Sequence, residues 1–477
     1  MNKNIQDIYP LSPTQHGMLF HSLHAPEMRL YHVQMVYTFS GNLNVNAFKQ
    51  AWQQVVNRHT ILRTSFYWEE LDKPLQVVHQ QVQVPIEYQD WQKLTPLEQQ
   101  ERLKSFLESD RIKGFDFSQA PLMRVAIIQI QKQAYYLVWS NHLIILDGWS
   151  YPLILKDVIE IYEAYCKGQD INSAGGSCFK DYINWLQKQD LSQAKEFWRR
   201  QLNGVKETTP LTNLDSNNLS NVEERYEDLQ ISLSKTTTKN LNSLAKQHRL
   251  TMNTLVQGAW AILLSYYSGE SDIVYGCTFS GRPVDLNNSQ SMVGEMVNTL
   301  PVHIQVNLNE NLLPWLQQLQ IQLVEIREYE YSPLVDVQKC SEVPGNQPLF
   351  ESFVVFENQK TGKFLKEWGS LNISECNNFY KTNYPLTIVG YPGAELTIGI
   401  NYDFCRFGAG TIANILEHLK ILLEGIAANP QTILNKLLLL VEQKPHPKLL
   451  VLEEEMSLNF DYLAIKTENK EFEALNL

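Results

Sequence analysis

The segment Ser140-Asn141-His142-Leu143-Ile144-Ile145-Leu146-Asp147-Gly148-Trp149-Ser150 holds the polar residues on which the interpretation of the whole chain depends. It follows the apolar run Ala134–Trp139, which predicts a buried strand, and it precedes a helical pattern that begins at Tyr151. A histidine and a carboxylate in such an apolar context cost free energy unless they are paired. They therefore mark a candidate site, although a core histidine and an Asp-Gly turn that caps a helix would explain the same residues.

The composition is that of an ordinary globular protein. The chain has 477 residues, of which 44% are hydrophobic and 19% are charged, and this length suggests two or more domains. A net charge of -12 without a basic stripe argues against a nucleic-acid partner. The 6 cysteines are scattered, which fits a reduced cytoplasmic protein and argues against a metal site. No apolar run reaches the ~18 residues that span a membrane, and the N-terminus lacks a signal-peptide pattern.

Hydrophobic periodicity predicts helices and strands that alternate along the chain without a regular repeat. Ser12 before Pro13 predicts the start of a first helix, residues 96–113 an amphipathic helix, and Phe179 to Leu202 a single helix. Strands are predicted at 33–39, 76–78, 84–86, 121–130, 134–139, 229–233, 272–279, 297–306, 349–357, 386–389 and 396–403. The pattern fits α/β or α+β halves, each with its own sheet.

Composition also suggests where the domains divide. The stretch from Gly168 to Gly176 is rich in Gly, Ser and Asn and reads as a connector. We therefore expect an N-terminal domain at 1–176, a C-terminal domain at 177–443 and an acidic tail at 444–477. The tail is expected to be either a docking segment or a frayed terminus.

The spacing of His142, Asp147 and Gly148 resembles the His-His-x-x-x-Asp-Gly motif of the condensation domains of nonribosomal peptide synthetases. In that family the second histidine is the catalytic one, and here Leu143 stands at its position. Other stretches resemble further motifs of the family: Leu11–His21, Arg58–Phe66, Asp181–Trp185, Val293–Pro301, Tyr329–Leu334, Leu349–Ser352 and Tyr402–Phe407. The resemblance covers roughly residues 5 to 440.

The resemblance implies two chloramphenicol-acetyltransferase-like subdomains in a V-shaped pseudo-dimer with a central tunnel. Donor and acceptor peptidyl carrier proteins would dock at opposite mouths, and their phosphopantetheine arms would bring a donor thioester and an acceptor amine together. No cofactor bound to the chain itself is expected. Because no adenylation motif or carrier serine is found, we expect a free-standing monomer that works with other synthetase modules.

The resemblance also implies roles for individual residues. Asp147 would pair with an arginine, either Arg63 or Arg282, and the sequence does not choose between them. Gly148 would offer an N–H to the tetrahedral oxyanion, and Ser150 would cap the helix or face the tunnel. The remaining implied positions are Trp149, Asn298 and Thr299 beside the tunnel and Arg58 as a structural residue.

Because Leu143 stands at the position of the catalytic histidine, the sequence leaves more than one function open. Successive side chains of a strand point to opposite faces, so Leu143 would point into the tunnel and His142 into the core unless a bulge turns His142 round. One hypothesis is amide formation with a weakened or relocated base. Another is a non-catalytic domain that docks carrier proteins or recruits partner enzymes, and a third is transfer to a soluble amine or alcohol.

Overall fold

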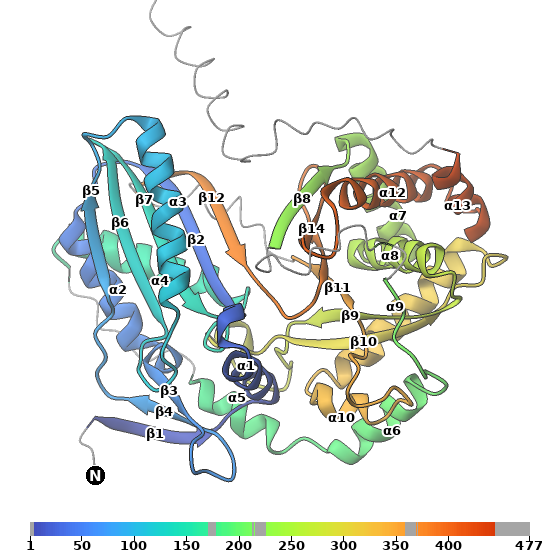
Figure 1. Ribbon diagram of the computed structural model, residues 1–477, viewed down its shortest axis with the longest axis horizontal. Helices are drawn as coiled ribbons and strands as arrows, with labels where there is room; N and C mark the ends of the chain where they lie inside the picture. The colour runs from blue at the N-terminus through green and yellow to red at the C-terminus, as the bar shows by residue number, and fades with distance from the viewer. Residues whose placement is uncertain are drawn as a thin grey trace, which may run out of the picture.

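The computed structural model describes residues 4–169, 178–211, 214, 226–357, 369 and 371–443. These residues form two halves that meet at their base and diverge above it, as Figure 1 shows. Each half is built on its own sheet with helices packed against it, which confirms the predicted α/β class. The predicted tail at 444–477 and most of the predicted connector lie outside the described residues.

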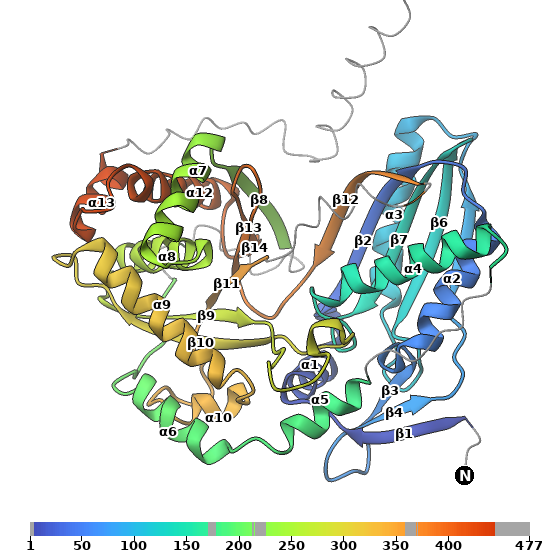
Figure 2. The ribbon, with the colours of Figure 1, turned by 180° about the vertical axis from the view of Figure 1, so that it is seen from behind.

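The N-terminal half contains a mixed five-stranded sheet. Its strands, in spatial order, are β12 (Asn372–Tyr380), β2 (His32–Ser40), β7 (Ala134–His142), β6 (Met123–Gln131) and β5 (Ile86–Asp90). Helices α2 (Val45–Arg58) and α4 (Ser150–Cys166) cover one face, and α3 (Pro96–Lys113) covers the other (Figures 1 and 2). The buried Trp52 of α2 meets Trp139 of β7 edge to face, with ring centroids 5.0 Å apart, which fixes this helix layer on the strand that leads to the site.

The C-terminal half contains a six-stranded sheet. Its strands, in spatial order, are β10 (Asn298–Gln305), β9 (Asp272–Phe279), β11 (Ser352–Phe356), β13 (Leu386–Tyr391), β14 (Thr397–Asp403) and β8 (Tyr226–Ser232). The helices around it are α7 (Lys235–His248), α8 (Met252–Ser268), α9 (Leu312–Glu328), α12 (Ala409–Ala428) and α13 (Leu434–Glu442). A Cβ on Gly276 of β9 would lie 2.4 Å from the ring of Phe350, so this position requires glycine for close packing.

Short elements complete the base of the molecule. Helix α1 (Pro13–His24) begins at the Ser12 cap, as predicted, and Gln15 completes a capping box. A three-stranded sheet lies beside it, formed by β1 (Ile5–Pro10), β4 (Leu75–His79) and β3 (Thr64–Tyr67). Helix α10 (Leu334–Gln338) follows α9.

The structure corrects two expectations about the segments that join the halves. The single helix predicted from Phe179 to Leu202 is wrong, because the chain forms α5 (Phe179–Leu186) and α6 (Leu191–Gln201). Asp190 starts α6 by accepting a 2.9 Å hydrogen bond from the Ser192 N–H. Strand β12, which the sequence pattern missed, comes from the C-terminal part of the chain yet pairs with β2 of the N-terminal sheet.

Asp110 anchors α3 to its sheet. Its carboxylate accepts 2.6 Å hydrogen bonds from Gln34 and Ser140 and pairs with Arg124. Burial alone would raise the pKa of Asp110, but hydrogen bonds from His32 and Arg124 and the charge of Arg124 hold it well below its usual range. The carboxylate therefore stabilises the folded state at every pH at which it is ionised.

We predict that Asp110→Asn lowers the free energy of unfolding by about 3–5 kcal/mol at neutral pH, because Arg124 then loses its partner. Since the folded pKa is depressed, this contribution is complete above the unfolded pKa of ~3.9 and disappears as the pH falls through the folded value. Urea unfolding at about pH 7 and pH 3 measures this dependence, and the difference between Asp110→Asn and the parent should be smaller at pH 3 than at pH 7. Glu101→Gln, at an exposed position of the same helix, should cost little, and an equal loss in both variants would contradict the account.

Candidate active site

The predicted site lies on the turn between β7 and α4. β7 ends at His142, and the next residues turn sharply before α4 begins at Ser150. The Leu143 N–H donates to the carbonyl of Tyr31 at 2.9 Å, so the turn stays attached to the end of β2. Residues 144–146 are completely buried and anchor the turn in the N-terminal core.

Asp147 is held by an arginine from the other half. The Arg282 guanidinium donates to the two carboxylate oxygens of Asp147 at 2.7 and 3.0 Å, and both side chains are buried. The Met296 N–H donates to the same carboxylate at 3.2 Å. A buried, bidentate pair of this kind fixes the geometry of the turn and ties it to the C-terminal half.

Arg63, the other candidate partner of Asp147, does not contact it. Its guanidinium donates to the Val56 carbonyl at 3.1 Å and to Gln6 at 2.8 Å, and it also bonds to the His79 carbonyl. Arg63 therefore joins the end of α2 to the small three-stranded sheet. Of the two candidate partners, Arg282 therefore holds Asp147. Arg63 does not, because its guanidinium is bonded to carbonyl oxygens at the base of the N-terminal half.

The Ser150 hydroxyl is occupied by contacts that hold the turn. It donates to Asp147 at 2.7 Å and accepts a 3.1 Å hydrogen bond from the Gly294 N–H of the other half. Ser150 is completely buried. A Cβ on Gly294 would lie 2.2 Å from the Phe179 ring, so the loop before β10 needs glycine at this position.

His142 points into the core, as strand alternation predicts. Its Nδ1 accepts a 3.1 Å hydrogen bond from the Ile144 N–H, which places the ring proton on Nε2, near the Ser22 hydroxyl at 3.3 Å. Burial, with the nearby charge of His32, lowers the pKa of His142 to about 3 against a smaller opposing effect of the Leu30 carbonyl. His142 is therefore neutral near pH 7, and its unprotonated nitrogen already accepts a hydrogen bond.

Leu143 is half-buried against the N-terminal core. Beside it, Gly148 is exposed, and a Cβ placed there would meet no atom within 4 Å. Trp149 is half-buried, donates its indole N–H to the Gln290 carbonyl at 2.9 Å, and lies under the Arg282 guanidinium at 5.3 Å. On this turn Leu143 and Gly148 are at least partly accessible, and the buried Asp147–Arg282 pair lies beneath them in the fold.

The other predicted positions support the surrounding elements. The Asn298 amide donates to the carbonyls of Glu330 and Ser332 at 2.9 and 2.8 Å, which fastens the turn after α9. Thr299, next to it on β10, is half-buried. Arg58 pairs with Asp157 of α4 at 3.0 Å and so joins α2 to α4.

Glu295 is a buried carboxyl that the sequence pattern did not single out. It lies between Gly294 and Met296, which both bond to the turn. Burial raises the pKa of Glu295 well above its ordinary value, and the charge of Asp147 raises it further, against an opposing effect of Arg282. One acidic residue inside the apolar stretch Val293–Val297 was the available signal.

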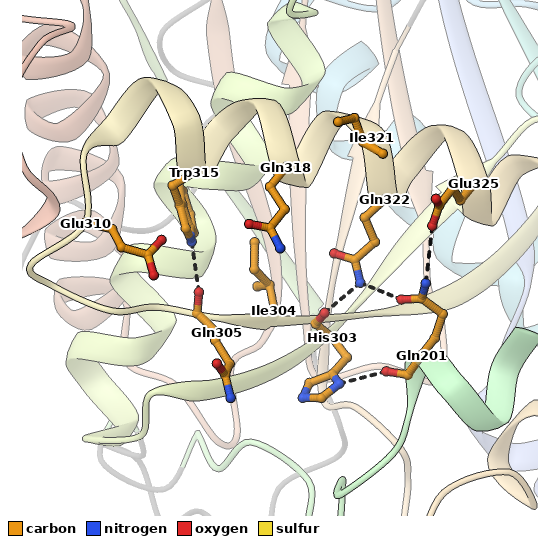
Figure 3. A pocket seen from close by; sticks show the side chains of 10 residues that line it. All are labelled: Gln201, His303, Ile304, Gln305, Glu310, Trp315, Gln318, Ile321, Gln322 and Glu325. Atoms are coloured by element: carbon orange, nitrogen blue, oxygen red, sulfur yellow. Dashed lines mark hydrogen bonds between the residues drawn. The ribbon is translucent and has the colours of Figure 1, made fainter.

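A separate groove runs along the free edge of β10, below α9 (Figure 3). It has a volume of about 460 Å³ and is lined mainly by amide and carboxyl side chains. The Gln322 amide donates to the carbonyl of His303 at 2.7 Å, and the Trp315 indole donates to that of Gln305 at 2.8 Å. These contacts satisfy the carbonyls of the sheet edge, and the His303 ring bonds to the Gln201 carbonyl at 2.8 Å.

The described residues show neither a metal-binding group nor a membrane-spanning helix. No cluster of three or more His, Cys, Asp or Glu side chains among them could hold a metal ion. Within the same residues, no helix combines the length and apolar character needed to cross a membrane.

We predict that Arg282→Met costs about 3–5 kcal/mol of unfolding free energy, because it leaves the Asp147 charge buried without a partner. The matched control is Arg58→Met, which breaks the partly exposed pair with Asp157 and should cost at most about 1 kcal/mol. Urea unfolding of both variants measures the difference. Equal losses would show that the buried pair does not hold the two halves together.

Comparisons with known proteins agree with this geometry. Residues 5–447 match a family model described as "Condensation domain". Linear gramicidin synthase subunits C and D of Brevibacillus parabrevis are 43% and 41% identical over 93% and 92% of this chain. The chain spans only 6% and 9% of the length of these two relatives.

Solved structures show the same fold at low sequence identity. The starter condensation domain of rhizomide synthetase RzmA superposes with a TM-score of 0.76 at 17% identity, covering 90% of this chain and 96% of that one. The X-domain from teicoplanin biosynthesis superposes with a TM-score of 0.75 at 21% identity, covering 91% of this chain and 97% of that one. The chain therefore belongs to the condensation-domain family of nonribosomal peptide synthetases.

Proposed function

We propose that this chain joins a carrier-bound acyl or aminoacyl thioester to an amine acceptor, and that it does so by positioning the reactants without a general base at residue 143. The observation that carries the proposal is the Asp147–Arg282 pair, buried and bidentate across the two halves. Asp147, Ser150 and Met296 form one bonded unit around the turn. These contacts hold the turn in one position between the two halves.

The reaction in this proposal is aminolysis of a thioester. The acceptor nitrogen attacks the thioester carbonyl, the carbon–sulfur bond breaks, and the donor carrier leaves as a phosphopantetheine thiol while the nitrogen gives up a proton. Gly148 is exposed, and in this proposal its N–H is the donor for the oxyanion. Donor and acceptor carrier proteins, with their phosphopantetheine arms, are the partners of this reaction.

The magnitudes permit activity without the histidine. A positioned general base contributes about 10²- to 10⁴-fold in rate, whereas alignment of the reactants can contribute on the order of 7–11 kcal/mol. The thioester is already activated, so positioning retains most of the acceleration. His142 does not replace the base, because its Nδ1 is bonded to the Ile144 N–H and its pKa is lowered to about 3.

A second candidate function is a non-catalytic domain that docks carrier proteins or recruits an enzyme. Two observations favour it. Leu143 cannot accept a proton, and His142 is buried and neutral near pH 7, so neither residue can act as a base there. A solved structure of the teicoplanin X-domain, which shares the fold, shows it in a complex with OxyB. The two candidates differ in whether any amide product forms.

We predict that Leu143→His increases single-turnover amide formation by about 10²- to 10⁴-fold, because the support of the turn is already in place. The assay uses a donor thioester on a carrier protein, an amine acceptor and intact-mass detection. Leu143→Gln is the control, since it adds polarity and similar volume without a base. Product from the parent chain as well as from the variant supports the condensation proposal.

A different pattern would favour the second candidate. Carrier binding by the parent chain and by Leu143→His, with no product from either, would contradict the condensation proposal. Equal rates for Leu143→His and Leu143→Gln would contradict the assignment of residue 143 as the vacant base position.

A further inference from the structure

A basic groove lies along the exposed face of α7 in the C-terminal half. It has a volume of about 340 Å³, and its lining includes Lys235, Lys239 and Lys246 of α7 together with Gly393 and Ala394 of the connection between β13 and β14. All three lysines are exposed, and no acidic residue is among the described residues that line the groove. The groove therefore presents three positive charges without a carboxylate in its walls.

Helical spacing arranges the three lysines in one stripe. Lys235, Lys239 and Lys246 are separated by 4 and 7 residues, which are about one and two turns of an α-helix, so their side chains leave α7 on the same face. At a rise of ~1.5 Å per residue, the stripe is about 16 Å long. The lysines form no block in the sequence, and the expectation that the chain has no basic stripe is therefore wrong.

The other side of α7 is fixed in the core of the C-terminal half. Leu241, Leu244 and Ala245 are buried there. Thr238 is also buried, and its hydroxyl accepts a 2.9 Å hydrogen bond from the Leu396 N–H. These contacts prevent rotation of the helix, so the lysine stripe is held in one orientation on the surface.

An acidic stretch of the same chain complements this groove in charge. The stretch Leu452–Asp461 contains Glu453, Glu454, Glu455 and Asp461 and no Lys or Arg, and it lies outside the described residues. The sequence allows this tail to be either a docking segment or a frayed terminus. Four carboxylates opposite three ammonium groups favour the docking segment.

The end of the described chain lies close enough for this contact. Helices α7 and α13 both pack against α12 (Figure 1). Packed helices lie 8–10 Å apart, so α12 separates the other two by at most about 20 Å across its width. The 10 residues from Gln443, which follows α13, to Glu453 can extend over about 33–36 Å. The tether is therefore long enough to cross α12.

We infer that the acidic stretch Leu452–Asp461 docks in the groove of its own chain and covers the lysine stripe of α7. Exposed ion pairs are individually weak, but a short tether gives the second partner an effective concentration in the millimolar range. Several weak pairs therefore suffice within one chain. An acidic partner protein would have to displace the stretch before it reached these lysines. The contact is independent of the proposed function, because it involves neither the turn after β7 nor an amide product.

Carbodiimide cross-linking of the full chain tests the inference, because this reagent joins a carboxylate to a lysine amine that it contacts. An equal mixture of ¹⁴N- and ¹⁵N-labelled chains is treated at low salt, and the digest is read by mass spectrometry. We expect cross-links from residues 453–455 to Lys235, Lys239 or Lys246, with both peptides carrying the same label. Cross-links between differently labelled peptides would identify a second copy as the occupant and overturn the inference, as would the absence of cross-links to these lysines.

Matched variants measure how far the stretch covers the groove. In the variant Glu453→Gln/Glu454→Gln/Glu455→Gln, the three lysines should be acetylated about twofold faster or more than in the parent, as expected if the groove is occupied at least half of the time. Exposed Lys104 of α3 is the internal reference. The difference should vanish at 1 M salt, where the Debye length is about 3 Å.

The control variant is Glu468→Gln/Glu471→Gln/Glu473→Gln, which removes the same number of charges from another part of the tail. It should leave the acetylation rates of the three lysines unchanged. Equal rates in the parent and the first variant, or an equal increase in both variants, would overturn the inference. Neither measurement requires turnover, so the outcome does not depend on whether the chain forms an amide product.

Discussion

The buried ion pair between Asp147 and Arg282 is the interaction on which the site depends. It joins the turn after β7 to the loop after β9, in different halves of the molecule, and the two side chains are 2% and 0% exposed. Charges this deep need hydrogen-bond partners, and Ser150 and Met296 add to the two bonds that Asp147 accepts from Arg282, whose Nε is left without a partner. The position of the turn therefore depends on the relative placement of both halves.

This arrangement separates support from chemistry. The residues that hold the turn act through buried contacts, and none of them requires a histidine at position 143. Leu143 contributes apolar packing at the edge of the N-terminal core and takes no part in the support. The support is therefore compatible with both of the functions proposed above.

Several features were predictable from sequence because they depend on local periodicity. Strand alternation predicted that the side chain of His142 is buried, and the Ser12–Pro13 signal located the start of α1. The choice of Arg282 over Arg63 was not predictable, since it depends on a contact across 135 residues of sequence. The structure resolves it because carbonyls near the small sheet bind Arg63.

Other features escaped prediction for equally physical reasons. Strand β12 carries polar residues on both of its faces, so its sequence lacks the alternation that marks a half-buried strand, and its pairing with β2 is a long-range choice. The break between α5 and α6 depends on the Asp190 cap within an otherwise helical pattern. The alignment of Asp228, Asn401 and Thr387 across three neighbouring strands also depends on strand register, which the sequence pattern does not give.

The central claim is that the turn retains its support but offers no titratable base near neutral pH. Long-range ¹H–¹⁵N spectra of histidine-labelled protein test it most directly, with His142→Gln used to assign the ring. The account predicts that His142 stays neutral, with its proton on Nε2, between about pH 5 and 8. A His142 ring that titrates within this range would be an available base, and it would contradict the account.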